Sequence, residues 1–225
     1  MPAMPTLANY HPPTEPWIDI VYEDDRLILL DKPSGLLTVP GKDISLADCL
    51  EARVQARYPD RPETKVVHRL DKDTSGLLLM AFDKAALGHL GSQFEHRKVE
   101  KSYVARVWGQ MEEDTGLVDL PLATDWENKP RQRVDFENGR VAQTRWRVIG
   151  REPEATRLEL TPLTGRTHQL RVHMLSIGHP ILGDTFYATG AALAAADRLQ
   201  LHAQTLGFFR PDDQSWRVFT RPAPF

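Results

Sequence analysis

The residues best suited to chemistry lie in a short polar segment between two apolar ones. Residues 66–81 read Val-Val-His-Arg-Leu-Asp-Lys-Asp-Thr-Ser-Gly-Leu-Leu-Leu-Met-Ala. Buried strands on both sides of a turn hold it rigidly, and rigid turns present catalytic side chains. Asp71 is therefore a candidate catalytic carboxylate. Asp73 and Thr74 also fit a purely structural role, because such residues cap the backbone amides of tight turns.

A second polar cluster lies at 163–180, Leu-Thr-Gly-Arg-Thr-His-Gln-Leu-Arg-Val-His-Met-Leu-Ser-Ile-Gly-His-Pro. His168 and Arg171 fall three residues apart and share one side of a predicted helix. A buried arginine needs an anionic partner, because an unpaired buried charge is costly. We expect that partner to be a loop carboxylate such as Asp71 or a phosphate of a ligand. Tyr103, in an alternating segment, fits a core tyrosine unless a site lies beside it.

Composition limits the class of protein. The 225 residues are 41% hydrophobic and 26% charged, as in ordinary globular proteins, and they fit one large domain or two small ones. We expect neither a membrane span nor a signal peptide, since no apolar run is long enough and the first 17 residues lack a basic and an apolar region. A single cysteine, Cys49, excludes an internal disulfide and a multi-cysteine metal site.

The net charge of −3 argues at first sight against a nucleic-acid partner. The charge is unevenly distributed, however: residues 61–110 and 128–180 carry +3 and +5, and residues 1–60 and 111–127 carry −5 and −6. Arginine suits bidentate phosphate contacts and base stacking. Among the arginines of the second basic segment are Arg131, Arg133, Arg140, Arg145, Arg147, Arg166 and Arg171.

The elements that must position these residues follow from hydrophobic periodicity. Residues 1–17, rich in proline, predict an extended arm, and 18–33 predicts two strands around an Asp-Asp turn. Helical spacing predicts helices over 45–58, capped by Asp43 or Ser45, over 84–96, and over 167–178, with Thr167 as the expected N-cap and Gly178 at the end. Further strands are predicted at 66–67, 77–82, 99–109, 141–149, 156–163, 201–209 and 216–220. Many strands with few helices favour an α+β fold with a mixed, mostly antiparallel sheet and flanking helices and loops.

Three competing motifs fit poorly. Asp73-Thr74-Ser75-Gly76 and Asp114-Thr115-Gly116 spell aspartic-protease motifs, but no apolar strand ends directly before either aspartate and the two lie too close for two lobes. Asp71-x-Asp73 also occurs in haloacid-dehalogenase-like phosphatases, whose alternating strands and helices and Mg²⁺ site are not evident here. His168 and His173 are five residues apart, not the four of a metalloprotease helix. We therefore expect no metal.

Five ordered segments together resemble the RluA family of RNA pseudouridine synthases. His68 to Gly76 resembles the family signature His-Arg-Leu-Asp-x-x-Thr-Ser-Gly. The other segments are 31–36 (Asp-Lys-Pro-Ser-Gly-Leu), 101–103 (Lys-Ser-Tyr), 163–173 and 178–184 (Gly-His-Pro-Ile-Leu-Gly-Asp). The arm at 9–17 is closer still to the branch of the family that modifies both large-subunit rRNA and tRNA. No room remains before residue 31 for the S4-like domain of many relatives, so we expect one catalytic domain over 18–225.

The resemblance implies specific roles. Asp71 would be the essential carboxylate, acting either as a nucleophile on C1′ or as a base that gives a glycal. Arg171 would pair with it, and Tyr103 would stack on the target uracil, with Leu170 or Val172 covering the other face. Arg69 would fill the space left by an extruded base, and His68 would assist or only support the turn.

The same resemblance implies partners and setting. The partners would be rRNA and tRNA stem-loops, with no membrane, metal or cofactor, for a cytoplasmic monomer. An alternative from another class, a catalytically silent RNA-binding protein, rests on the basic segments alone. The residues expected to contact RNA besides Arg69 and His68 are Lys101, Arg131, Arg133, Arg166 and His168.

Overall fold

The computed structural model describes residues 10–225, which form two compact units. Residues 1–9 of the predicted arm lie outside the described residues. Unit 1 comprises residues up to Lys101 together with Ala203–Pro224, and unit 2 comprises Ser102–His202 with Phe225. The chain crosses between the units within two strands, β5 (Glu100–Trp108) and β11 (Leu201–Phe209). Unit 1 is thus built from both ends of the chain.

Unit 1 is a sheet with two helices. Its strands follow the order β1-β2-β4-β11, with β3 beside β4 and β12 beside β11. Their bounds are β1 Ile20–Glu23, β2 Leu27–Lys32, β3 Lys65–Val66, β4 Ser75–Ala81 and β12 Trp216–Thr220. The pairs β1–β2, β2–β4, β3–β4 and β11–β12 are antiparallel. All seven residues of β4 are buried, as its apolar run predicts for a strand covered on both faces.

The helices of unit 1 begin where a side chain can cap them. The helix α2 (Lys84–Glu95) has Asp83 as N-cap, with its carboxylate accepting from the amide of Ala86. Its apolar residues join the core of β2, β4 and β11. The predicted helix over 45–58 is a 3₁₀ turn at Ile44–Leu46, capped by Asp43, and then α1 at Leu50–Arg57, capped by Cys49. The prediction of one continuous helix was therefore wrong.

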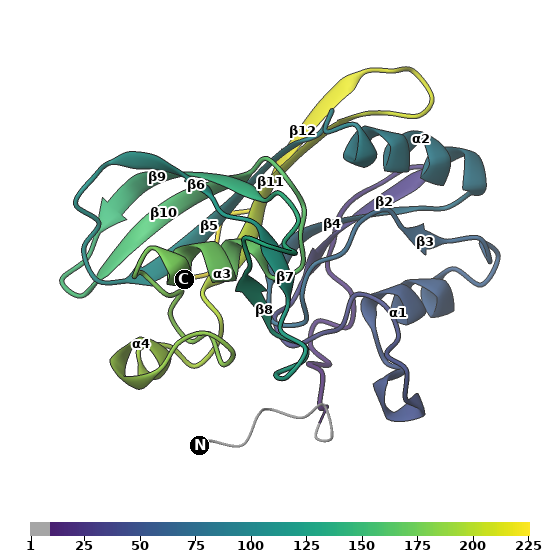
Figure 1. Cartoon of the computed structure of the whole chain (residues 1–225). Helices are drawn as coiled ribbons and strands as arrows, with labels where there is room; N and C mark the ends of the chain where they lie inside the picture. The colour runs from purple at the N-terminus through teal and green to yellow at the C-terminus, as the bar shows by residue number, and fades with distance from the viewer. Residues whose placement is uncertain (1–9) are drawn as a thin grey trace. The chain divides into compact units, whose positions relative to one another are not determined.

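Unit 2 holds a second set of antiparallel strands. The order is β5-β10-β9-β6, and a separate two-stranded sheet is formed by β7 and β8. The bounds are β6 Thr115–Asp119, β7 Leu122–Thr124, β8 Gln132–Val134, β9 Gln143–Arg151 and β10 Ala155–Pro162. The helices are α3 (Gln169–Ser176) and α4 (Gly190–Ala194). Leu170 and Met174 of α3 pack into the core with residues of β5 and β10. Figure 1 shows α3 lying along the sheet that contains these strands.

The α+β class and the mostly antiparallel strands confirm the predicted fold class. The helix predicted from Thr167 begins later, because His168 is its N-cap and adopts a left-handed conformation with φ 53°. The sequence patterns missed β6, β7, β8 and α4, which are only three to five residues long. The prediction of one catalytic domain over 18–225 stays a prediction.

Candidate active site

The loop that carries Asp71 lies in unit 1, between β3 and β4. The amide of Thr74 donates to the carbonyl of Asp71 (3.2 Å) and closes a turn. The loop then enters β4 through Gly76, whose φ is +114°. A side chain at Gly76 would put its Cβ 2.3 Å from the carbonyl oxygen of Ala203, so only glycine fits there. The signature therefore ends in glycine because β4 and β11 approach closely.

The segment after β2 clamps this loop from one side. The Nζ of Lys32, a fully buried residue, donates to the carbonyl of Lys72 (2.8 Å) and to that of Leu36 (2.7 Å). The amide of Gly35 donates to the same Lys72 oxygen (2.9 Å). The hydroxyl of Ser34 donates to the carbonyl of Asp73 (2.7 Å). Residues 31–36 thus fix the backbone directly after Asp71.

Thr38 completes the clamp on the other side of Asp71. Its buried hydroxyl donates to the carbonyl of Leu70 (2.7 Å) and accepts from the amide of Leu70 (3.3 Å). Tyr10 lies behind this segment: its hydroxyl accepts from the amide of Leu37 (2.9 Å) and donates to the carbonyl of Asp48 (2.9 Å). The residues before and after Asp71 are therefore both held by side chains of the same segment.

His68 supports the loop from within. Its Nε2 accepts from the amide of Leu79 (3.2 Å), and its ring stacks on Phe94 with centroids 4.6 Å apart. Burial, and to a smaller extent the nearby ammonium of Lys101, lowers the pKa of His68 to about 3. A neutral ring is what accepting the Leu79 amide requires. This geometry fits support of the turn better than contact with RNA.

Arg69 and Lys101 are the cations of unit 1 expected to contact RNA. Arg69 is exposed, and its side chain makes no hydrogen bond or ion pair with the described residues. Burial, and then repulsion by Arg97, lowers the pKa of Lys101. No carboxylate among residues 10–225 pairs with Lys101 or Arg97. Two neighbouring cations without a carboxylate between them favour an anionic ligand.

Arg171 in unit 2 has a carboxylate partner that was not foreseen. Its Nε donates to Oδ2 of Asp184 (2.8 Å) and its Nη2 to Oδ1 (2.7 Å), a bidentate pair. Both side chains are buried, Arg171 at 2% and Asp184 at 0% exposure. Oδ1 also accepts the amides of Phe186 (2.9 Å) and Tyr187 (3.2 Å). Asp184 therefore holds the edge of the guanidinium group made by Nε and Nη2.

Asp184 is held by the turn that precedes it. Gly183 has φ +67°, and a Cβ there would lie 2.2 Å from the carbonyl oxygen of Arg198. The Gly-Asp pair was visible in the segment 178–184, but no role was assigned to it. The signal that could have found it is a lone acidic residue inside an apolar segment, Ile-Leu-Gly-Asp, which requires a buried cation as partner.

His168 and Arg166 are both held near the start of α3. The Nδ1 of His168 lies 2.7 Å from the hydroxyl of Tyr187, and its ring stacks on Phe186. The Nε of Arg166 donates to the carbonyl of Val141 (3.1 Å). The side chain of Arg166 has no carboxylate partner among the described residues.

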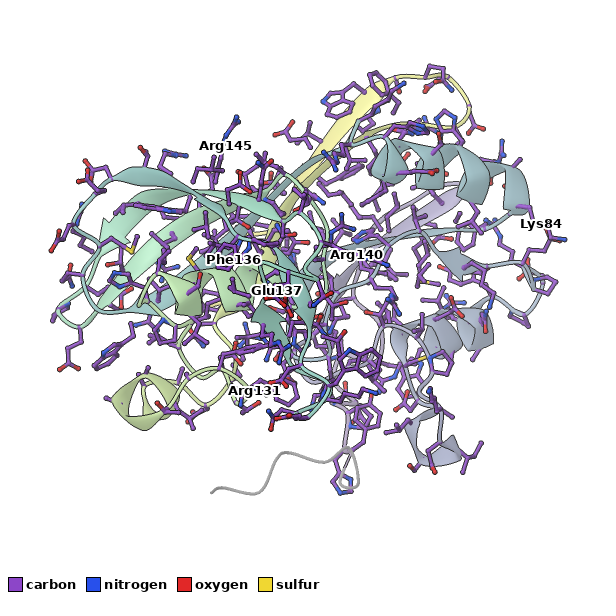
Figure 2. All side chains as sticks on the ribbon, viewed as in Figure 1. Lys84, Arg131, Phe136, Glu137, Arg140 and Arg145 are labelled. Carbon is purple, nitrogen blue, oxygen red and sulfur yellow. The ribbon has the colours of Figure 1, made fainter. Side chains whose placement is uncertain are left out.

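The remaining expected cations lie on or beside the β7–β8 hairpin. Arg131 places its Cζ 5.3 Å from the ring centroid of Tyr187. Arg133 pairs with Asp135 (3.1 Å) and is exposed. Figure 2 shows Arg131 and Arg140 at this hairpin, with the exposed Phe136 between them in the chain. Tyr187 thus gathers Arg131, His168 and Arg171 around one side chain.

Tyr103 lies on β5, opposite Leu160 of β10, and packs partly buried against the core of unit 2. Leu170 and Val172, expected to cover the other face of a uracil, are instead buried in two hydrophobic clusters. Asp71 thus belongs to unit 1, whereas Tyr103 and Arg171 belong to unit 2.

In the part of the chain from residue 10 onward, no group of three or more His, Cys, Asp or Glu side chains is arranged to hold a metal ion. None of the helices there is both long and apolar enough to span a bilayer.

Comparison with known proteins identifies the class. Residues 26–176 match the family model described as RNA pseudouridylate synthase. Two relatives named "Dual-specificity RNA pseudouridine synthase RluA" are similar to this chain. The protein from Vibrio cholerae is 50% identical over 97% of this chain and 88% of its own length, and that from Escherichia coli is 49% identical over 97% and 99%.

Two solved structures of pseudouridylate synthase proteins are also similar to this chain. Human RNA Pseudouridylate Synthase Domain Containing 1 superposes with a TM-score of 0.77 and 29% identity, over 92% of this chain and 84% of that one. The corresponding human Domain Containing 4 protein gives 0.71 and 26%, over 92% and 88%. Fold and sequence together define an isomerase that forms pseudouridine in RNA. The chain belongs to the RNA pseudouridylate synthase family.

Proposed function

We propose that this enzyme converts particular uridines to pseudouridine in stem-loops of both 23S rRNA and tRNA, including the tRNA anticodon stem-loop. The names of its relatives, which describe dual specificity, support this substrate range. Recognition of a loop rather than a groove sequence fits RNA, whose single-stranded loops are the parts that proteins read most readily.

We assign the chemistry to Asp71. Isomerisation breaks the bond between C1′ and N1 of the uracil, turns the base, and forms a bond between C1′ and C5, after which C5 loses its hydrogen as a proton to solvent and N1 gains a proton. An ionised carboxylate can attack C1′ directly, or it can remove a ribose proton to give a glycal. The single observation that carries this assignment is the clamp on the Asp71 loop, which fixes Leu70, Lys72 and Asp73 by hydrogen bonds.

Arg171 would pair with Asp71 as well as with Asp184. The segment 163–173 resembles the arginine motif of the family, and that resemblance implies that this arginine pairs with the essential aspartate. We therefore assign Arg171 as the cationic partner of Asp71 during the reaction.

Tyr103 would bind the target base, and Arg69 would stabilise the RNA from which that base is extruded. Tyr103 would stack on the uracil, and Arg69, exposed and unpaired among the described residues, would occupy the space that the extruded base leaves. Extrusion costs a few kcal/mol and less in a strained loop, which contributes to selection.

The phosphate contacts would come from cations that lack carboxylate partners in the described chain. Those expected from the sequence are Lys101, Arg131 and Arg166. Arg133, paired with Asp135, would contribute less, and His68 and His168 would act mainly by supporting the backbone.

The setting follows from the reaction. Isomerisation involves no net oxidation or reduction, so we propose that it needs neither a metal nor a cofactor. We also propose a cytoplasmic monomer, since its rRNA and tRNA substrates lie in that compartment. Light scattering on the purified protein checks the oligomeric state, and a dimer peak would contradict it.

Tritium release tests the proposed function. Transcripts of rRNA and tRNA stem-loops labelled at C5 of uridine should release tritium when the wild-type protein is added. Asp71→Asn should retain RNA binding and lose turnover by at least about a thousandfold. Release by the variant would move the reactive group elsewhere. No release by wild type, with binding intact, would favour a silent RNA-binding protein.

A further inference from the structure

The hydroxyl of Tyr187 is a junction between two elements of unit 2. It accepts the backbone amide of Gln132, the first residue of β8, at 2.8 Å. It also lies 2.7 Å from Nδ1 of His168, the N-cap of α3. The hydroxyl has one hydrogen to give, and Nδ1 of a neutral imidazole can accept it. One buried oxygen thus ties the β7–β8 hairpin to the start of α3.

The hairpin needs such a tie. Its strands are three residues each and form a two-stranded sheet, to which Leu122 of β7 adds a single antiparallel bridge with Arg140. An isolated two-stranded hairpin is marginally stable in water. Leu122 of β7 and Val134 of β8 do pack against Tyr187 and Val172, but apolar contact alone fixes position loosely. The directional bond to the Gln132 amide sets where β8 lies.

Arg131 immediately precedes that bond. Its Cζ lies 5.3 Å from the centroid of the Tyr187 ring, within the range of a cation–π interaction. The ring also lies 5.1 Å from Cζ of Arg171. The backbone amide of Tyr187 donates to Asp184, which holds Arg171. The same residue therefore borders both an RNA-contacting arginine and the catalytic arginine.

The substitution Tyr187→Phe keeps the link of this residue to Asp184 and Arg171 and removes its link to β8. The link to Asp184 and Arg171 uses the backbone amide and the ring, both of which phenylalanine keeps. The link to β8 uses the hydroxyl, which phenylalanine lacks. Removing the hydroxyl should therefore disturb the hairpin and spare Arg171.

We propose that Tyr187 is a positioning residue for RNA binding, whose hydroxyl holds β8 and thereby sets Arg131 against the RNA backbone. This inference rests on the proposed function, in particular on Arg131 contacting RNA.

Measurements of RNA affinity and of turnover distinguish a positioning role in RNA binding from a role in the chemical step. Tyr187→Phe should raise the Kd and KM for a stem-loop RNA about fivefold, the value of one net hydrogen bond, while kcat stays within about twofold. Binding is measured by fluorescence anisotropy of a labelled stem-loop and turnover by tritium release. The matched control is Tyr22→Phe, which removes a tyrosine hydrogen bond to Asp24 (3.0 Å) in unit 1 and should change neither Kd nor kcat.

A double-mutant cycle identifies the route of the effect. In an Arg131→Ala background, Tyr187→Phe should raise Kd by less than about twofold, because the group that it positions is gone. Three results would overturn the inference: an unchanged Kd in Tyr187→Phe, additive effects on Kd in the cycle, or a loss confined to kcat. If wild type binds no stem-loop RNA or Arg131→Ala leaves Kd unchanged, it is the proposed RNA contact that fails.

Discussion

Asp184 is a candidate site residue that the structure shows and that the sequence motifs did not predict. Asp184→Asn should lower kcat at least about tenfold, because the amide offers Arg171 one acceptor oxygen in place of two. It should also lower the free energy of unfolding by about 3–5 kcal/mol, since a buried guanidinium loses its charge partner. Denaturant unfolding and single-turnover kinetics measure the two effects.

A control variant distinguishes the loss of Arg171 positioning from the loss of a charge pair alone. Arg53 forms a comparable bidentate pair with Asp48 in unit 1. Asp48→Asn should lower stability while leaving kcat of the folded protein unchanged. If Asp184→Asn costs stability alone, Asp184 holds the fold and does not position Arg171.

His68 predicts a dependence of stability on pH. The pKa of His68 falls to about 3 in the folded protein from about 6.5, so between these values the unfolded chain binds a proton that the folded chain does not. This contribution to stability is complete above pH 6.5 and is lost as the pH falls through the window. His68→Gln, which can still accept the Leu79 amide, should flatten the dependence.

Urea unfolding between pH 7 and pH 4 measures this dependence of the free energy of unfolding on pH. His173, whose pKa is also lowered by burial, remains in both proteins, so the difference between them reports His68. Identical slopes for wild type and His68→Gln would show that His68 is protonated without cost in the folded state.

Residues 31–38 clamp the Asp71 loop through hydrogen bonds from Lys32, Ser34 and Thr38. Thr38→Val keeps the shape of the side chain and removes both hydrogen bonds to Leu70. The free energy of unfolding should fall by about 1–3 kcal/mol, since the carbonyl of Leu70 loses this donor. The kcat should fall severalfold as the loop loses its fixed position.

Thr64→Val is the control, because the buried hydroxyl of Thr64 donates to the carbonyl of Arg61 (2.7 Å), away from the loop. It should cost comparable stability with kcat unchanged. Equal kcat in both variants would mean that the clamp does not serve catalysis.

Most elements of the fold could be predicted from the sequence because their patterns are strong. The apolar run at 77–82 and the alternation at 99–109 marked β4 and β5 within two residues at either end. The strands β7 and β8 could not be predicted, because three residues carry no periodicity. The start of α3 was missed because His168 adopts a left-handed conformation, which no capping preference predicts.

The candidate site was predictable in its residue types and less so in their partners. Asp71 and Arg171 stood out because their surroundings are apolar. The partner of Arg171 lies 13 residues further along, beyond a turn whose path depends on Gly183 fitting against Arg198. Such tertiary contacts are set by packing between segments, which the local pattern of either segment does not contain.

At the scale of the whole molecule, the net charge of −3 conceals cations available for RNA. Removing Arg131 and Arg133 together should weaken the salt dependence of RNA binding, with log Kd against log salt losing about 0.7–0.9 per phosphate contact. Arg131 should account for most of this, because Asp135 already pairs with Arg133.

Titration of a stem-loop RNA at several salt concentrations gives the slope. Arg151→Ala removes an arginine already paired with Asp114 (2.7 Å) and serves as the control. A slope unchanged in the Arg131/Arg133 double variant would place the RNA footprint elsewhere on the protein.

The division of unit 1 between both ends of the chain sets an order of events during synthesis. Leu206 and Phe208 of β11 are buried in the core formed by β2, β4 and α2, so that core is incomplete until the last strands emerge. The intervening residues of unit 2 take roughly 5–20 s to translate. The loop that bears Asp71, though made early, therefore acquires its final support only after β11 has been made, and a premature stop before β11 damages the amino-terminal half.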